Sequence, residues 1–141
     1  MRREIRFEPG YDYRHDEDPK KRQNGCHGLQ LRFLVHGDKG SVQFLLMTDW
    51  LPTWKSIAEG GRVSRGSFGP LPGDLGYHAD EPQYEGQSAM ECSERPGKKC
   101  YYDGSSLNAD EPFRILVTAG DKALWEFLEQ YYRDVFHRSK Q

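Results

Sequence analysis

The sequence predicts an α+β fold in which two C-terminal helices pack on one face of an antiparallel β-sheet. Alternating apolar residues in the first third, a stretch rich in glycine and proline in the middle, and helical periodicity in the last third lead to this prediction. The chain has 141 residues, a length typical of one domain, so we expect residues 1–141 to form a single domain.

Low hydrophobicity does not indicate disorder in this chain. Hydrophobic residues make up 35% of it and charged residues 30%, and the mean hydropathy is -0.90. Disordered chains are usually poor in aromatic residues and strongly charged, whereas here aromatic residues make up 13% and the formal net charge is -2. We therefore expect a folded domain whose polar excess lies in two surface segments, residues 11–25 and 60–97.

Several functional classes do not fit the composition. The longest unbroken apolar run, residues 44–47, is far shorter than the ~20 residues of a membrane helix. Met1-Arg2-Arg3-Glu4 leads into alternating charges, which a signal peptide would not have. A pI of about 6.2 argues against a dedicated nucleic-acid binder. We expect a cytoplasmic protein with neither a membrane nor a nucleic acid as its partner.

The N-terminal third has the two-residue period of antiparallel strands. Ile5 and Phe7 alternate with charged residues in a short strand that ends at Pro9-Gly10. Two longer alternating segments then flank a turn over residues 36–40, which contains two glycines, and together they predict a β-hairpin. One face of this hairpin carries Leu29, Leu31, Phe33, Val35, Val42, Phe44 and Leu46. Further apolar residues on the second face predict packing on both sides, namely Leu34, Leu45 and Met47.

The middle of the chain predicts a long loop. Twelve of the glycines and prolines, which number 15 and 8 in all, fall between Gly60 and Gly97. No strand or helix period is visible there, and long loops of compact domains are usually functional. Because Phe68, Tyr77 and Tyr84 lie in this segment, we expect an ordered Gly/Pro-rich loop that packs on the core and contributes to the functional site.

Two further turns and two helices complete the prediction. A hairpin turning at Arg95-Pro96-Gly97 would place Cys92 directly opposite Cys100, and residues 103–106 form a second predicted turn. Asn108 or Asp110 can cap a helix with Pro112 in its first turn. That helix ends at Gly120, and another begins at Asp121. Helical spacing places on one face of the second helix Leu124, Phe127, Leu128, Tyr131 and Val135.

The three cysteines leave alternatives open. Cys92 and Cys100 could bind zinc together with Cys26 or His27, and with His78 as a further ligand. The seven residues between Cys92 and Cys100 exceed the usual spacing of structural zinc pairs. Reduced thiols in the core, or a disulfide between Cys92 and Cys100, also fit the sequence, so we predict no obligatory cofactor.

Other residues are candidates for binding a ligand. Asp80 and Glu81 could orient His78 as a general base, although a surface histidine in a turn fits the pattern better. Residues 60–66 offer two guanidinium groups to an anion but lack the P-loop and GxGxxG spacings. Two tryptophans flank a Leu-Pro bend, where they could anchor a binding surface. The candidate ligand-binding residues are Trp50, Trp54, Arg62, Arg65, Tyr77, His78, Tyr84 and Asp103.

Three segments carry a resemblance. They are Gly69-Pro70-Leu71-Pro72 continuing to Asp74-Leu75-Gly76-Tyr77-His78, then Tyr84-Glu85-Gly86-Gln87, then Cys100-Tyr101-Tyr102-Asp103-Gly104-Ser105. In these the chain resembles uncharacterised small proteins encoded in actinobacteriophage genomes, from the Gly28 hairpin to the last helix. The group has no assigned activity, so the resemblance implies no catalytic residue. It implies a protein made in the bacterial host cytoplasm during infection.

Three functions are compatible with the sequence. The first is stoichiometric binding of a host protein or a small anionic, nucleotide-like ligand without turnover, for example to block a host defence. The second is a metal-assisted or His/carboxylate hydrolase that uses His78, Asp80 and Asp103. The third is a virion or assembly component. No catalytic template is complete, which favours the first, and a homo-oligomer is compatible with each.

Overall fold

Six strands and two helices make up the described part of the chain. The computed structural model describes residues 1–9, 29–48, 71–92 and 97–137. The elements are β1 (Arg2–Pro9), β2 (Leu29–Gly37), β3 (Gly40–Thr48), β4 (Leu71–Ala79), β5 (Met90–Glu91), β6 (Lys99–Ser105), α3 (Asp110–Ala119) and α4 (Asp121–Phe136). The predicted N-terminal strand, the hairpin of β2 and β3 and both C-terminal helices are confirmed.

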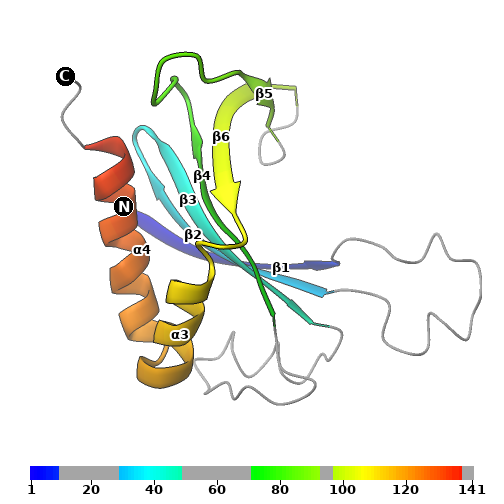
Figure 1. The fold of residues 1–141 in the computed structure, drawn as a ribbon, viewed down its shortest axis with the longest axis vertical. Helices are drawn as coiled ribbons and strands as arrows, with labels where there is room; N and C mark the ends of the chain where they lie inside the picture. The colour runs from blue at the N-terminus through cyan, green and yellow to red at the C-terminus, as the bar shows by residue number, and fades with distance from the viewer. Residues whose placement is uncertain (10–28, 49–70, 93–96, 138–141) are drawn as a thin grey trace, which may run out of the picture.

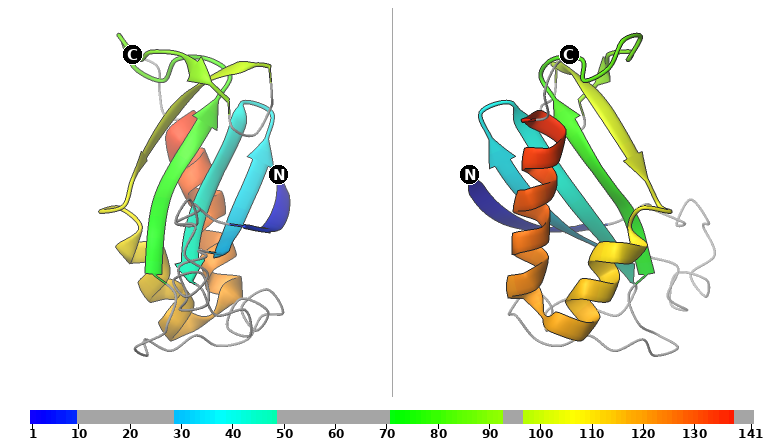
Figure 2. Two further views of the ribbon diagram at one scale, coloured as in Figure 1. Left: turned by 90° about the vertical axis from the view of Figure 1, so that its right-hand side faces the viewer. Right: turned by 60° about the vertical axis from the view of Figure 1, so that its left-hand side comes forward.

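The strands form one antiparallel sheet with both helices on one face. Its strand order is β1-β2-β3-β4-β6-β5, and every neighbouring pair is antiparallel. Figure 1 shows α3 and α4 next to each other beside the sheet, and the views of Figure 2 agree that they cover the same face. The predicted α+β arrangement is therefore confirmed. Among the described residues, no helix is long and apolar enough to cross a membrane.

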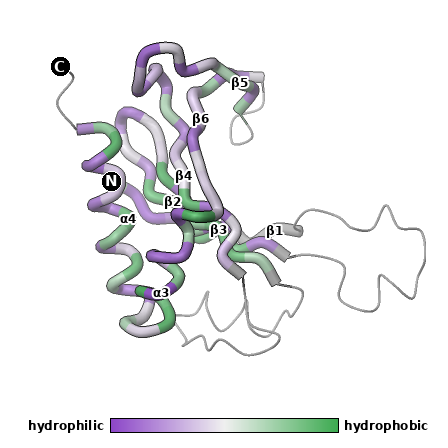
Figure 3. The backbone as a smooth tube through the Cα atoms, in the orientation of Figure 1, coloured by the Kyte–Doolittle hydropathy of each residue, from purple (hydrophilic) through white to green (hydrophobic). Residues whose placement is uncertain are grey.

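The apolar core lies between the helices and this face of the sheet. Phe33 and Phe44 pair across β2 and β3, and both are fully buried. Trp125 of α4 packs edge-on against Phe33, with 5.4 Å between the ring centroids. Figure 3 shows hydrophobic and hydrophilic residues alternating along α4, as expected of a helix with one buried face. Phe127 and Tyr131 are only partly buried against this core.

Residues 71–79 correct the prediction of a continuous loop between Gly60 and Gly97. They form β4, which pairs with β3 on one side and β6 on the other. Pro72 is tolerated because the register of β3 and β4 shifts between Leu45 and Leu46, a bulge of the kind that accommodates proline. Gly76 is required, because a Cβ there would overlap the backbone of β6 at Asp103. Glycine and proline usually indicate a loop, so the sequence of this strand looks like that of a loop.

Three smaller predictions are also wrong in detail. Residues 103–105 continue β6, so the predicted turn begins only after Ser105. The first helix has Ala109 at its N-cap without a side-chain hydrogen bond, so neither Asn108 nor Asp110 caps it. Met90 is the residue that pairs with Cys100. The backbone amide of Cys92 instead donates to Lys98 (N···O 2.8 Å), so the two cysteines are diagonal neighbours.

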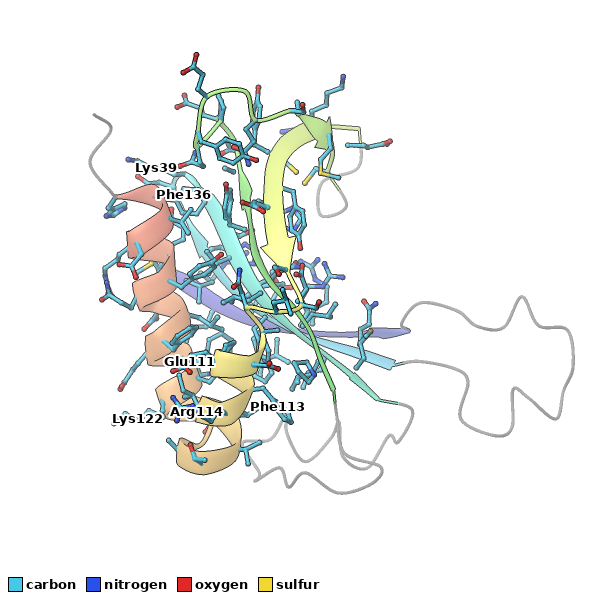
Figure 4. The ribbon with its side chains drawn as sticks, in the orientation of Figure 1. Lys39, Glu111, Phe113, Arg114, Lys122 and Phe136 are labelled. Carbon is cyan, nitrogen blue, oxygen red and sulfur yellow. The ribbon has the colours of Figure 1, made fainter. Side chains whose placement is uncertain are left out.

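The tip of the hairpin between β2 and β3 contacts the end of α4. The backbone amide of Lys39 donates to the Tyr132 hydroxyl (N···O 2.9 Å), which in turn donates to the Asp38 carboxylate (O···O 3.2 Å). The Lys39 ammonium donates to the carbonyl oxygen of Phe136 at 3.3 Å. Figure 4 shows Lys39 and Phe136 together at this end of α4. The sheet therefore supplies a cation and hydrogen bonds to the C-terminal turn of the helix.

Candidate metal centre

One histidine and two cysteines come together on the sheet face opposite the helices. They are His78 on β4, Cys92 just after β5 and Cys100 on β6, and their ligand atoms all lie within 4.8 Å of one another. Nδ1 of His78 is 3.6 Å from Sγ of Cys100. The exposed fractions of the three residues are 5%, 2% and 1%. Figure 1 shows β4, β6 and β5 side by side at one end of the sheet, where β4 and β6 carry His78 and Cys100 and Cys92 directly follows β5.

Strand register explains this cluster. His78 pairs with Tyr102 across β4 and β6, so Cys100, two residues before Tyr102, lies on the same face of the sheet as His78. The hydrogen bond between Cys92 and Lys98 places Cys92 diagonally next to Cys100. Neither cysteine forms a disulfide with a described residue. Two strands, β4 and β6, and the residue that follows β5 thus contribute one ligand atom each.

A hydrogen bond to Gln43 on β3 fixes the imidazole of His78. The amide oxygen of Gln43 accepts from Nη1 of Arg32 at 3.2 Å, which sets the orientation of the amide. The same oxygen lies 3.2 Å from Nε2 of His78. Because this oxygen only accepts, Nε2 of His78 carries the hydrogen, and the lone pair of Nδ1 faces Cys100. This is the arrangement that metal-ligating histidines show in proteins, where the second ring nitrogen donates to an acceptor.

Tyr102 packs beside His78 and extends the polar network. Their ring centroids are 4.6 Å apart, and the Tyr102 hydroxyl accepts a hydrogen bond from Nε2 of Gln43 at 3.3 Å. The same hydroxyl donates to the Asp74 carboxylate. Gly104 permits this contact, because a Cβ there would overlap both the Tyr102 hydroxyl and the Asp74 carboxylate.

Asp74 has an elevated pKa in this network. Burial raises the pKa of its carboxyl above the ordinary value, and the nearby Asp103 carboxylate adds to this increase. The hydrogen bond with Gln43 and the charge of Arg32 act in the opposite direction without cancelling the increase.

A pocket of about 330 Å³ lies next to the cluster. His78 and Cys92 line it on the β4 side, while Arg2, Arg6 and Glu4 line it on the β1 side. The Glu4 carboxylate lies 2.7 Å from Nε2 of His36 and 3.2 Å from Nη2 of Arg6. Burial alone would raise the pKa of Glu4, but hydrogen bonds with His36 and Arg6 outweigh it, and the net effect lowers that pKa.

The structure separates several of the other predicted site residues. His78 is buried in a strand, so the prediction of a surface histidine in a turn is wrong. Tyr77 lies on the helix-covered face, where its ring packs edge-on against Phe136 (centroids 5.9 Å apart). Asp103 pairs with Tyr77 across β6 and β4 and shares that face, so it does not join His78. Tyr84 is 55% exposed in the segment after β4.

Six predicted residues cannot be compared with the structure. Outside its described residues lie Cys26, His27, Trp50, Trp54, Arg62 and Arg65.

The residues that orient His78 were not among the predicted site residues. Gln43, Arg32 and Tyr102 form its surroundings. The sequence held a signal for one of them, because Gln43 is a polar residue in the middle of an otherwise apolar strand. The structure shows that its side chain is only 4% exposed, and a buried polar group needs a hydrogen-bond partner. Finding its partner required β4, which the sequence pattern did not reveal.

No protein-family model, no curated protein and no solved structure matches the chain. The resemblance to actinobacteriophage proteins and the cytoplasmic location therefore stay predictions.

Proposed function

We propose that the protein binds a transition-metal ion of the zinc class through Nδ1 of His78 and the thiolates of Cys92 and Cys100. The observation that carries this proposal is the convergence of these three ligand atoms within 4.8 Å of one another. Buried cysteines and histidines are common, but three such groups meeting at one point with a prepared imidazole are typical of metal centres.

The spacing fits tetrahedral zinc. Bond lengths of about 2.3 Å to sulfur and about 2.0 Å to nitrogen imply a separation of about 3.5 Å between a sulfur and a nitrogen ligand. The observed distance between Nδ1 of His78 and Sγ of Cys100 is 3.6 Å. A hydrogen bond from the thiol to the imidazole would have a similar length, so metal content is what distinguishes the two interpretations.

Charge balance also favours a divalent ion. Cys92 and Cys100 are almost fully buried, and two thiolates there without a cation would be costly. A divalent ion between them and a neutral imidazole gives a centre with no net charge. Thiolate and imidazole are the ligands that zinc prefers, whereas magnesium and calcium prefer oxygen. The ion would also link β4 to the hairpin of β5 and β6.

Elemental analysis of protein purified without chelator tests the proposal. We expect about one zinc per chain, and we expect Cys92→Ala and Cys100→Ala to lose it. Cys26→Ala and His27→Ala, measured in parallel, test the ligands that the sequence predicts in addition. Wild-type protein that stays metal-free after incubation with zinc, or cysteine variants that keep the ion, would contradict the proposal.

The broader roles predicted from the sequence stay predictions. Stoichiometric binding of a host protein or nucleotide-like ligand and a virion role rest on the sequence alone. Metal-assisted hydrolysis is our second candidate, and one observation supports it: the pocket reaches His78 and Cys92. Because His78 and Asp103 lie on opposite faces, any such activity would use the metal and not the predicted His78–Asp103 pair.

A further inference from the structure

We infer that the pocket beside the metal centre binds a small anion of the phosphate class. One oxygen of this anion would coordinate the ion held by His78 and Cys92, and the others would meet the guanidinium groups on β1. The inference rests on the proposed metal site. The evidence is a pocket of about 330 Å³. Its lining includes two of the proposed metal ligands, His78 and Cys92, and the guanidinium groups of Arg2 and Arg6.

The volume suits such a ligand. Small-molecule sites usually measure about 300–1,000 Å³, so this pocket lies at the small end of the range. Between the two groups the lining is formed by Gly37, Gly40 and Ser41 at the start of the hairpin turn and of β3. Ser41 pairs with His36 on one side and with His78 on the other, so its small side chain is the one that lies between β2 and the metal centre on this face.

Donors on β1 and β2 already surround one carboxylate. Glu4 accepts from Arg6, lies 2.7 Å from Nε2 of His36, and is 3.9 Å from a guanidinium nitrogen of Arg2. A phosphate oxygen and a carboxylate oxygen accept hydrogen bonds in the same way, and guanidinium groups bind both. We therefore treat Glu4 as an internal substitute for the anion, with which an incoming phosphate competes for Arg6 and Arg2.

The electrostatics determine what ligand can enter. Arg2 and Arg6 carry two positive charges, and Glu4 and Asp80 carry two negative charges in the same lining. The ion with its two thiolates adds no net charge. A phosphate group that displaces Glu4 gains the hydrogen bonds of the guanidinium groups, and it gains a bond to the ion as well. Metal ions and arginines together are a common way to bind phosphoryl oxygens.

Cobalt substitution of the full-length protein tests the metal and the anion separately. Cobalt bound by two thiolates gives visible absorption bands whose positions depend on the coordinating ligands. We would titrate the cobalt protein with inorganic phosphate, pyrophosphate and ADP, against chloride at equal ionic strength. We expect saturable band shifts with all three phosphate compounds, and none with chloride.

Three variants sharpen the experiment. Glu4→Gln removes the competing carboxylate and should tighten anion binding about tenfold, whereas Arg6→Gln should weaken it about tenfold, each through one charged hydrogen bond. Arg3→Gln is the matched control, because Arg3 lies on the same strand but pairs with Glu129 on the helix-covered side. Its anion affinity should equal that of the wild type. Cobalt uptake shows that each variant still folds at the site.

The outcomes separate the two proposals. Failure of the wild type to give thiolate–cobalt bands would contradict the metal site itself. Normal cobalt bands that no phosphate compound shifts would overturn only the anion inference, as would a fourth cobalt ligand from the chain that no anion displaces. A response to ADP without one to pyrophosphate would also overturn it, because the nucleoside would then be the recognised group. Equal affinities for Glu4→Gln, Arg6→Gln and Arg3→Gln would exclude Arg6 and Glu4 from the site.

Discussion

The two faces of the sheet differ in what their side chains do. The helix-covered face carries fully buried aromatic and aliphatic side chains such as Phe33, Phe44 and Leu46, which pack against α3 and α4. The opposite face carries Arg32, Gln43 and His78, which are joined by hydrogen bonds. Apolar burial is non-directional, whereas hydrogen bonds fix the orientation of each partner.

This difference assigns separate tasks to the faces. Burial on the helix-covered face supplies most of the free energy of folding. One apolar residue of the opposite face, Leu34, is also fully buried, although both described helices lie on the other side. The polar residues around Leu34 contribute less to the free energy of folding than the apolar core does, and their main effect is to orient His78. Substitutions on the two faces should therefore have different consequences.

The largest expected effect is on the helix-covered face. Phe44→Ala should lower the free energy of unfolding by about 3–5 kcal/mol, because it removes a fully buried ring that stacks on Phe33. Urea denaturation measures this change, and the protein that remains folded should still bind one zinc. Leu45→Ala, one residue later and half-buried on the other face, is the control. An equal loss for both substitutions would contradict the division between the faces.

The next effect concerns the orientation of His78. Gln43→Leu removes the acceptor of its Nε2 hydrogen and should weaken zinc affinity about 10- to 100-fold, measured by competition with a chromophoric chelator. Gln43→Glu retains an acceptor and should restore the affinity. Gln30→Leu is the control, because Gln30 accepts from Arg32 but has no hydrogen bond with His78 among the described residues. Unchanged affinity in Gln43→Leu would exclude a positioning role.

The smallest effect is expected at the ion pair of Arg3 and Glu129, which links β1 to α4. The hydrogen bond from Arg3 outweighs burial and lowers the pKa of Glu129. A lowered pKa means that the pair stabilises the fold above the pKa of the unfolded glutamate, and that this stability is lost as the pH falls through the folded value. Because the pair is partly exposed, with 45% of the Arg3 side chain and 20% of the Glu129 side chain accessible, Glu129→Gln should cost only about 0.2–1 kcal/mol at neutral pH.

Urea denaturation at two pH values tests this prediction. The difference between wild type and Glu129→Gln should be present at about pH 7 and should shrink as the pH falls below the ordinary glutamate pKa of about 4.3 and through the lowered pKa of the folded carboxylate. A difference that persists at low pH would mean that the glutamine perturbs the packing of α4 instead.

Regular periodicity made several elements of this fold predictable. Alternation over β2 and β3 and helical spacing in α4 identified those elements, because each has one face in the core. β4 was missed because Gly73 and Gly76 interrupt its pattern, and Gly76 is required by the close approach of β6. Such packing depends on a strand that comes later in the chain, so it cannot be predicted from the local sequence of β4.

The candidate site was only partly predictable for the same reason. Cys92 and Cys100 could be paired from their predicted hairpin, although the register is diagonal and not direct. His78 could not be placed next to them without β4. Gln43 acts on His78 across the pairing of β3 with β4, and a pairing between distant strands cannot be inferred from spacing within either one.

The contact between the hairpin tip and α4 has a consequence for local motion. Helix ends usually fray, so the amide protons of the last turn exchange quickly with solvent. Here Lys39 holds both the Tyr132 hydroxyl and the Phe136 carbonyl. Opening the last turn of α4 therefore requires the tip of the β2–β3 hairpin to release it. The amides of residues 133–136 should exchange with deuterium at rates close to those of the central strands, as part of one cooperative unit.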